Sequence, residues 1–346
     1  MKIKIVVLDY ASVSGGAKVI SRYFNKEILK DTENKWYVFT SALEYETNEY
    51  IKNLKFPWIK KSLIHRYYFE KFHAQKLLKE IKPDVIISLQ NLKLNHSKIP
   101  HVLYIHQALP FYFGAKYKMS TNLLSTIKYK IMAKKLLNDT KEAKKIIVQT
   151  KFMKELIHKY NENVTSIIPN IFIEAPKNYE GDLNFFTPTN ALAYKRLDFI
   201  VEISRALKNY NFKNEIYLTV RGNENKHIAS IKETIEKEAL PVKFLGNLTR
   251  EEVIENYKNH ALLFTSEVES LGLPLLEAMH YGTPIFSYQT DFSKELLENY
   301  EQKVFFDDLK IERTLIDFLR SNHQKEGQNI NSRSLLELLK TNKLID

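Results

Sequence analysis

No cysteine occurs among the 346 residues of this protein. Its absence excludes disulfide bonds, thiolate metal sites and a cysteine nucleophile, and it suits a reducing compartment. Long apolar runs are absent as well. The run near the N-terminus meets Asp9, so it is too short for a signal-peptide core and far below the roughly 20 residues of a membrane span. We therefore expect a cytoplasmic protein that is soluble or attached peripherally to the inner face of the cell membrane.

Acidic residues are scarce in the first half of the chain. Residues 1–170 hold 30 Lys and Arg against 14 Asp and Glu, a net charge of +16, whereas residues 171–346 hold 22 against 27, a net charge of −5. Between Val85 and Asn138 there is no acidic residue. A general enrichment in lysine would not leave the second half acidic. The asymmetry therefore predicts an anionic partner for the first half.

Short apolar runs alternate with segments of helical period along the chain, which predicts parallel βαβ units. The length exceeds what one hydrophobic core usually organises, and Pro176 and Gly181 interrupt the pattern between Ile171 and Asn184. We therefore predict an α/β protein of two Rossmann-like domains that face each other across a cleft. Residues 1–170 form the N-terminal domain, 171–325 the C-terminal domain, and 326–346 a terminal helix that packs on either one.

The expected strands are Ile3–Leu8, Asp84–Leu89, His101–His106, Lys145–Gln149 and Val164–Ile168 in the first half, and Leu183–Pro188, Ile216–Arg221, Val242–Leu245, Ala261–Thr265 and Pro284–Ser287 in the second. Among the expected helices, Lys195–Lys208 follows the first strand of the second half.

A polar loop and a short helix follow one of the expected strands of the second half. Gly272 permits a close backbone approach and Pro274 suits a first helical turn, so a helix of about two turns starts near Leu273. Its free N–H groups and its dipole form a site for phosphate. Glu277 leans toward the start of this helix and Glu269 precedes it, so both carboxylates can accept hydrogen bonds from sugar hydroxyls. A sugar nucleotide presents both kinds of group.

Either glutamate alone would be interpreted as a residue that stabilises the start of a helix. The string from Glu269 to Pro284 is more specific, because seven residues separate Glu269 from Glu277, with Gly-Leu-Pro between them and Glu-Ala-Met and Gly-Thr-Pro after. It closely resembles glycosyltransferase family 4, within the glycosyl transferases group 1. The resemblance implies a retaining enzyme of the GT-B fold. It also implies that Glu269 contacts the donor sugar as a catalytic residue, that Glu277 binds the ribose, and that Gly272 and Leu273 belong to the donor site.

A basic pair opens the first expected helix of the second half. Tyr194-Lys195-Arg196 resembles the family's segment whose lysine neutralises the donor diphosphate, which places Lys195 and Arg196 in the donor site. An isolated Lys-Arg pair usually lies on the solvent-exposed surface without a specific role. The position of this pair directly after a strand favours phosphate binding instead. The family usually has an arginine where this chain has Asn190. Arg196 or Arg221 is the candidate to replace it.

Two segments of the first half agree with the resemblance. Gly15 and Gly16 resemble the family's glycine pair, whose backbone N–H groups approach the donor phosphate, although a glycine pair alone is no dinucleotide fingerprint. His106 resembles a histidine that the family places near the reaction centre. We expect it to orient the donor sugar or the acceptor hydroxyl as a catalytic residue, although a histidine at a strand end is more often structural. No Asp-x-Asp motif lies where a metal clamp is expected, so we expect neither a metal nor another cofactor.

Basic and aromatic residues interleave in Lys55–Lys79 and Phe111–Leu137. This composition suits an anionic membrane surface or nucleic acid; alternatively, the aromatic residues form core and the lysines a solvated face. Because the resemblance assigns the acceptor to the first domain, we predict a UDP- or GDP-sugar donor and a glycan or lipid-linked acceptor. The expected process is polysaccharide or glycolipid biosynthesis at an anionic membrane, without nucleic acid.

Two alternatives stay open at this point. The first is a sugar-nucleotide epimerase or a phosphorylase, because both use the same crevice of the GT-B fold, although the string from Glu269 to Glu277 fits transferases better. The second is a non-catalytic adaptor that binds a membrane or nucleic acid, which Asn190 keeps in consideration.

Overall fold

The computed structural model describes residues 3–11, 15–114, 123–171, 175–321, 323 and 326–345. The described residues within 1–117, 127–173 and 331–346 form one compact unit, and those within 118–126 and 174–330 form another. We call them the first unit and the second unit.

The first unit is built on a parallel sheet of seven strands in the order β3-β2-β1-β4-β5-β6-β7. Both faces of this sheet are covered, so its central strands are buried runs such as Lys4–Asp9 and Val85–Ser88 rather than alternating ones. The strand order reverses between β1 and β4, whose carboxyl ends therefore flank a switch point, the usual place for a ligand. The strands are β1 Lys4–Asp9, β2 Lys35–Thr40, β3 Ile51–Lys55, β4 Val85–Ser88, β5 His101–Tyr104, β6 Lys145–Val148 and β7 Val164–Ser166.

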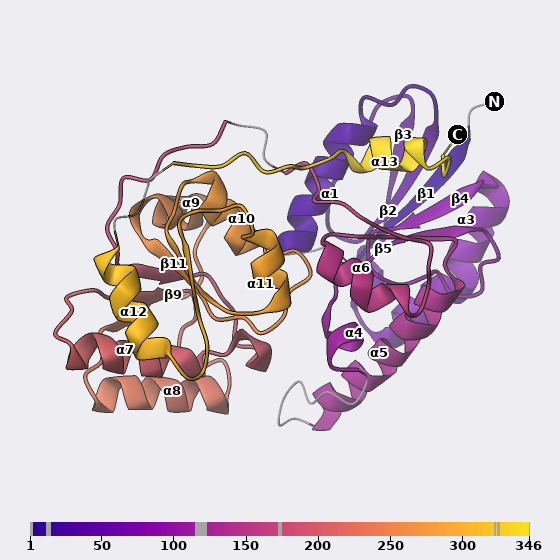
Figure 1. The fold of residues 1–346 in the computed structure, drawn as a ribbon. Coiled ribbons are helices and arrows are strands. Elements are labelled where there is room, and N and C mark those ends of the chain that lie inside the picture. The colour runs from indigo at the N-terminus through magenta and orange to yellow at the C-terminus, as the bar shows by residue number, and fades with distance from the viewer. Residues whose placement is uncertain are drawn as a thin grey trace. The chain divides into compact units, whose positions relative to one another are not determined.

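The helices of the first unit connect these strands on both faces of the sheet. The C-terminal helix α13 packs on α1, where the Leu336 amide donates to the Glu27 carboxylate at 3.1 Å, and Figure 1 shows the two helices together. The elements are α1 Gly15–Ile28, η1 Pro57–Lys60, α2 Leu63–Tyr68, the π turn η2 Phe69–His73, α3 Ala74–Ile81, α4 Leu109–Tyr112, α5 Leu123–Glu142, α6 Lys151–His158 and α13 Leu335–Thr341.

The second unit repeats the plan with six parallel strands in the order β10-β9-β8-β11-β12-β13. Its switch point lies between β8 and β11, which pair directly. The strands are β8 Phe185–Thr187, β9 Ile216–Leu218, β10 Val242–Phe244, β11 Ala261–Phe264, β12 Ile285–Tyr288 and β13 Lys303–Phe306. The helices are η3 Ala193–Lys195, α7 Asp198–Asn209, α8 Lys226–Lys237, α9 Arg250–Asn259, α10 Leu273–His280, α11 Asp291–Leu296 and α12 Ile311–Arg320.

The two parallel sheets with helical connections confirm the predicted α/β class and the two Rossmann-like folds. The sequence did not single out β2, β3 and β13, because their runs mix apolar with charged or aromatic residues. The predicted helix Lys195–Lys208 was wrong at its start: Arg196 has a left-handed φ of 46°, which ends η3 and makes α7 begin at Asp198. No helix of the described residues is long and apolar enough to span a bilayer.

Candidate functional site

The segments that follow β8 and β11 meet at the switch point of the second unit. β8 leads to the short helix η3, and β11 leads to the loop that carries Glu267 and Glu269. Two hydrogen bonds tie the segments together: Thr265 Oγ1 donates to the Lys195 carbonyl at 2.6 Å, and the Glu267 amide donates to the Tyr194 carbonyl at 2.8 Å. The fold therefore brings Lys195 beside the loop.

Lys195 and Glu269 form an ion pair at this point. The Lys195 ammonium donates to Glu269 Oε1, and both side chains are largely buried. A lysine that is this buried needs a negative partner, and a diphosphate is one that could replace the carboxylate. The arrangement places a cation and a carboxylate side by side. The predicted roles of Lys195 in binding the donor phosphate and of Glu269 in binding the donor sugar stay predictions.

The start of α10 lies at the end of the same loop. Gly272 has a left-handed φ of 67°, and a Cβ atom there would lie 2.8 Å from Leu296 Cδ1, so this position favours glycine. Leu275 and Leu276 donate to the Gly272 carbonyl, which puts the amides of Gly272 and Leu273 before the first hydrogen bond of the helix. These two amides are the N–H groups that an anion would meet there.

Glu277 is buried inside the second unit. Arg250 Nη1, from the start of α9, lies 2.6 Å from Glu277 Oε1, and the Tyr257 hydroxyl also interacts with this carboxylate. Burial raises the pKa of the Glu277 carboxyl, and the Arg250 guanidinium opposes that rise. A ribose would therefore approach a carboxylate that Arg250 already orients. The predicted contact with ribose hydroxyls stays a prediction.

Arg196 does not take part in the ion pair of Lys195 and Glu269 and has other partners. Its guanidinium pairs with Asp198 and Asp308, at 3.0 and 3.2 Å, and lies over the Phe199 ring at 4.2 Å. Two carboxylates thus already balance its charge. Arg221 is exposed and lies three residues past β9, which ends at Leu218 rather than at Arg221 as the sequence predicted. Its amide donates to Glu224 Oε1 at 2.6 Å. Neither residue contacts Lys195 in the described contacts, and the predicted role of Arg196 in donor binding stays a prediction.

In the first unit, the glycine pair lies at the start of α1, directly after β1. Gly15 and Gly16 are the first two residues of this helix, so their amides precede its hydrogen-bonded turns. A Cβ atom on Gly16 would meet no atom of the described residues within 4 Å. Ser14, which we associated with this pair, lies outside the described residues. Among the described residues, the start of α1 therefore leaves space beside Gly16.

His106 lies just past β5 and is held by Asn91, which follows β4. The His106 amide donates to Asn91 Oδ1 at 2.7 Å, and this fixes the orientation of the side-chain amide, whose nitrogen lies 3.2 Å from His106 Nε2. Because the amide nitrogen donates, Nε2 accepts and the ring carries its proton on Nδ1. Burial lowers the pKa of His106 to about 4. The imidazole is therefore neutral near pH 7 and suited to orient a hydroxyl.

Three residues that contact the predicted site residues were not identified from the sequence: Asn91, Arg250 and Tyr257. Asn91 has a left-handed φ of 68°, and asparagine is one of the few residues other than glycine that adopt that conformation readily, which is a local signal. Arg250 and Tyr257 carry no local signal, because their contact with Glu277 spans two helices. Only the packing of α9 against α10 reveals it.

The second unit matches a known family. Residues 171–334 match the family model described as Glycosyl transferases group 1. The chain contains a glycosyl transferases group 1 domain. This domain includes Lys195, Glu269, Gly272 and Glu277, whereas Gly15, Gly16 and His106 lie outside the match. No curated protein matches the chain in sequence.

Solved structures of glycosyltransferases share the fold of the whole chain. One is WaaG, a glycosyltransferase involved in lipopolysaccharide biosynthesis, with a TM-score of 0.68 and 14% identity over 92% of this chain and 91% of that chain. The sucrose-phosphate synthase of Thermosynechococcus elongatus has a TM-score of 0.67 and 12% identity over 92% and 89%. HepE of Anabaena in complex with UDP-glucose has a TM-score of 0.64 and 14% identity over 91% and 88%. The glycosyl transferases group 1 domain thus belongs to a protein of the GT-B fold, as predicted.

Proposed function

We propose that this protein is a retaining, metal-independent glycosyltransferase that moves a sugar from a UDP- or GDP-sugar to a glycan or lipid-linked acceptor. The observation that carries the proposal is the ion pair of Lys195 and Glu269. It lies at the switch point of the glycosyl transferases group 1 domain, beside the amides of Gly272 and Leu273. In the proposed reaction, Lys195 and these amides stabilise the diphosphate as it leaves. Glu269 binds hydroxyls of the transferred sugar.

His106 is proposed to orient the sugar or the acceptor hydroxyl. A neutral ring whose Nε2 accepts from Asn91 keeps Nδ1–H as its donor, which can serve a hydroxyl without a change of charge. Gly15 and Gly16 are proposed to meet the donor phosphates through their amides. Arg196 is proposed to support the donor site indirectly, because its guanidinium fixes the turn that carries Lys195.

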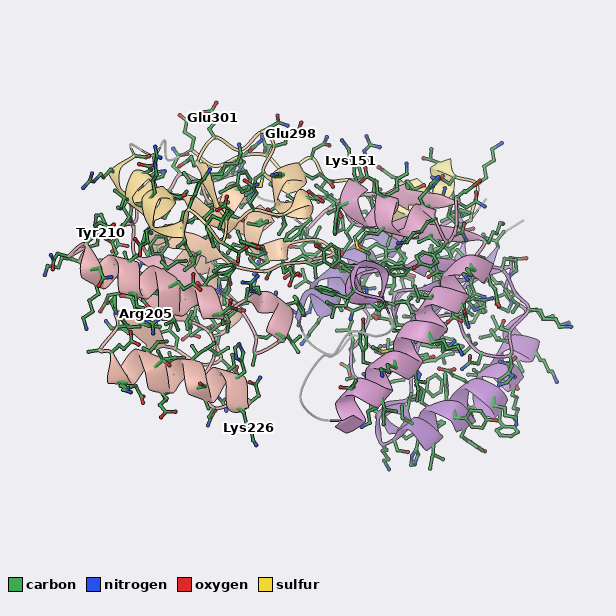
Figure 2. The ribbon with its side chains drawn as sticks, turned by 60° about the horizontal axis from the view of Figure 1, so that its bottom comes forward. Lys151, Arg205, Tyr210, Lys226, Glu298 and Glu301 are labelled. Atoms are coloured by element: carbon green, nitrogen blue, oxygen red, sulfur yellow. The ribbon has the colours of Figure 1, made fainter. Side chains whose placement is uncertain are left out.

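Donor binding is the first test. Thermal shift with UDP, GDP and their sugar conjugates should stabilise the protein with one nucleotide class, and Lys195→Met should abolish the shift. Lys226→Met is the matched control, because Lys226 projects from the start of α8 in the same unit (Figure 2). No shift with any nucleotide, or an equal shift in Lys195→Met, would contradict the donor site.

The reaction type is tested on the product. Incubation of the shifting nucleotide-sugar with acceptor should give a glycoside whose anomeric configuration, measured by NMR, equals that of the donor. The rate should be unchanged in EDTA. Inversion, a dependence on added divalent metal, or epimerisation of the donor without acceptor would each contradict the proposal.

The acceptor is proposed from charge. The basic first half suits an anionic acceptor such as a lipid diphosphate, and polysaccharide or glycolipid assembly on the cytoplasmic face of the membrane fits that chemistry. WaaG is described as acting in lipopolysaccharide biosynthesis, which supports an acceptor of this class. Transfer to a lipid-linked sugar in detergent, compared with transfer to the free sugar, tests it. A preference for the free sugar would argue against the lipid.

A further inference from the structure

Helix α2 and the π turn η2 carry large apolar side chains on their solvent side. Leu63 is 72% and Ile64 78% exposed, and three aromatic residues are each at least half exposed. We call these residues the outer α2 face: Leu63, Ile64, Tyr67, Tyr68 and Phe72. Contiguous apolar surface of this kind on a folded protein marks a binding surface.

The opposite side of the same helix is firmly packed. Phe69 is fully buried and meets the rings of Tyr10 and Trp58 edge to face, at 5.5 and 5.8 Å between centroids. Glu70 is buried as well, where it accepts from the Tyr10 hydroxyl at 3.0 Å and from Arg66 Nε at 2.8 Å. The core therefore fixes the rotation of the helix, and the outer α2 face points outward as a consequence.

The π turn keeps the face continuous. A turn with i→i+5 hydrogen bonds holds more residues than an α-helical turn, so η2 rotates Phe72 back toward the side of Ile64 and Tyr68. The centroids of the Tyr68 and Phe72 rings are 5.3 Å apart. An α-helical turn would carry Phe72 further around the helix. The π turn thus keeps Phe72 in line with Tyr68 on the outer α2 face.

Basic residues surround this face. Lys60, Lys61 and Lys71 are exposed, and no acidic residue occurs from Lys55 to Phe69. The next acidic residue along the chain, Glu70, is buried and paired with Arg66. The rim of the outer α2 face therefore carries positive charge that no carboxylate in this stretch offsets.

A second helix of the first unit has the same composition. On α5, Ile131 is 67% exposed and Met132 is exposed beside it. Three neighbouring lysines are also exposed: Lys128, Lys130 and Lys134. The segment after β4 contacts both helices, because the Lys93 amide donates to Asp139 of α5 at 2.9 Å and the His96 ring meets the Tyr67 ring at 6.5 Å. Two apolar and basic helices thus flank one segment.

The combination of exposed apolar side chains with surrounding lysines distinguishes between the possible binding partners of the outer α2 face. The buried centre of a protein–protein interface is depleted in lysine, and nucleic acid gains little from exposed Leu63 and Ile64. Aliphatic and aromatic side chains bordered by lysine are typical of a helix at a lipid interface, where the chains enter the headgroup region and the lysines meet anionic lipids. We propose that the outer α2 face docks this protein on a lipid bilayer with anionic headgroups. The inference rests on the proposed function, because docking would present the first unit to a lipid-linked acceptor.

Vesicle flotation of the full-length protein tests the face. The wild type should float with vesicles of phosphatidylcholine and phosphatidylglycerol in equal parts, and not with phosphatidylcholine alone. The double variant Leu63→Glu/Ile64→Glu should lower the partition coefficient by about tenfold or more. Both changes fall in the first turn of α2 after the Ser62 cap, where glutamate favours a helix, so the variant should stay folded.

Two controls match this variant. Lys226→Glu changes the net charge by the same two units and also places glutamate in the first turn of an exposed helix, α8. Leu309→Glu removes a side chain that is 90% exposed in the second unit. Both should float as the wild type does. Equal losses in the controls and in the double variant would overturn the assignment of the face.

Charge is tested separately. Lys61→Gln/Lys71→Gln should weaken binding by about 25-fold, since each lysine near an anionic surface contributes about fivefold. Lys226→Gln/Lys237→Gln, on α8, should have no effect. Equal binding to vesicles without anionic lipid would overturn the proposal. So would concentration-dependent dimerisation that Leu63→Glu/Ile64→Glu abolishes without vesicles.

The nucleotide thermal shift separates this inference from the proposed function. A protein that shifts with its nucleotide but does not float at low salt would refute the docking and leave the transferase proposal intact. Flotation without any nucleotide shift would refute the transferase proposal and leave the docking intact. The Leu63→Glu/Ile64→Glu variant should keep the full nucleotide shift.

Discussion

Lys195 and Glu269 lie 74 residues apart in the chain, and their side chains form one ion pair at the switch point of the second unit. In the proposed donor site, this pairing would link recognition of the diphosphate by Lys195 to recognition of the sugar by Glu269. A diphosphate that binds Lys195 competes with the carboxylate and would release Glu269 toward the sugar. Recognition of the phosphate and of the sugar would then be coupled.

Glu269→Gln should separate diphosphate binding from sugar transfer. We expect the affinity for the nucleoside diphosphate to stay equal or to rise, because Lys195 loses its negative partner, while kcat falls by about 100-fold or more. Isothermal titration with UDP or GDP and steady-state rates measure the two effects. Glu267→Gln, on the same loop, is the control and should change neither by more than severalfold. A parallel loss of diphosphate affinity would show that Glu269 does not compete for Lys195.

Arg250→Met should lower the free energy of unfolding, because Glu277 is buried and Arg250 is its positively charged partner. Removal of the guanidinium leaves the carboxylate without its cation, and we expect a loss of about 2 kcal/mol in the free energy of unfolding, below the value for a fully buried pair because Arg250 is partly exposed. Urea denaturation measures it. The double variant Arg250→Met/Glu277→Gln should recover most of the loss, and additive losses would show that the two side chains do not interact.

The pH dependence of Arg250→Met follows from the raised pKa of Glu277. The folded state binds the proton of Glu277 more tightly than the unfolded state, whose carboxyl titrates near 4.5. Stability from this group is therefore present below about pH 4.5 and falls as the pH rises through the folded pKa. Without Arg250 the rise in pKa is larger. The variant should lose more stability relative to the wild type at pH 7 than at pH 4, and an equal loss at both would contradict this.

His106→Ala should lower kcat by about 100-fold or more while the nucleotide thermal shift is retained. The ring also predicts a pH effect on stability. Its folded pKa of about 4 lies below the usual value of 6.5, so the unfolded state binds more protons and stability falls as the pH drops from 6.5 toward 4, by roughly 3 kcal/mol. His106→Gln should flatten this slope. The exposed His158→Gln is the control, and wild-type rates in His106→Ala would remove His106 from the mechanism.

Asn190→Arg should strengthen donor binding. Asn190 is exposed after β8, where its Oδ1 accepts from the Leu192 amide at 3.2 Å. It occupies the position at which the resembled family usually has an arginine. A guanidinium there should raise the affinity for the nucleotide-sugar by about tenfold through charged hydrogen bonds to phosphate. Titration calorimetry measures it, with Asn223→Arg as the control. An unchanged affinity would place the phosphates away from residue 190.

The sequence by itself determined the α/β plan. Strand and helix periods are local, so runs such as Val85–Ser88 and the helix that begins after Gly272 could be predicted from their own residues. Arg196 shows the limit of this method: the helical pattern around it is regular, yet its left-handed backbone and its pairing with Asp198 and Asp308 delay the helix to Asp198. The start of a helix depends on such contacts.

Tertiary structure alone decided which polar groups meet and which aromatic residues are core. Glu269 was predicted as a hydroxyl acceptor, but its pairing with Lys195 required the adjacent strands β8 and β11. The segment Lys55–Lys79 left open whether its aromatic residues form core or a surface, and the packing of Phe69 answered that both occur: Phe69 is buried and Tyr68 is exposed. Hydrophobic period and composition can be determined from neighbouring residues in the sequence. Which side of a helix is buried depends on its rotation, and residues distant in the sequence fix that rotation.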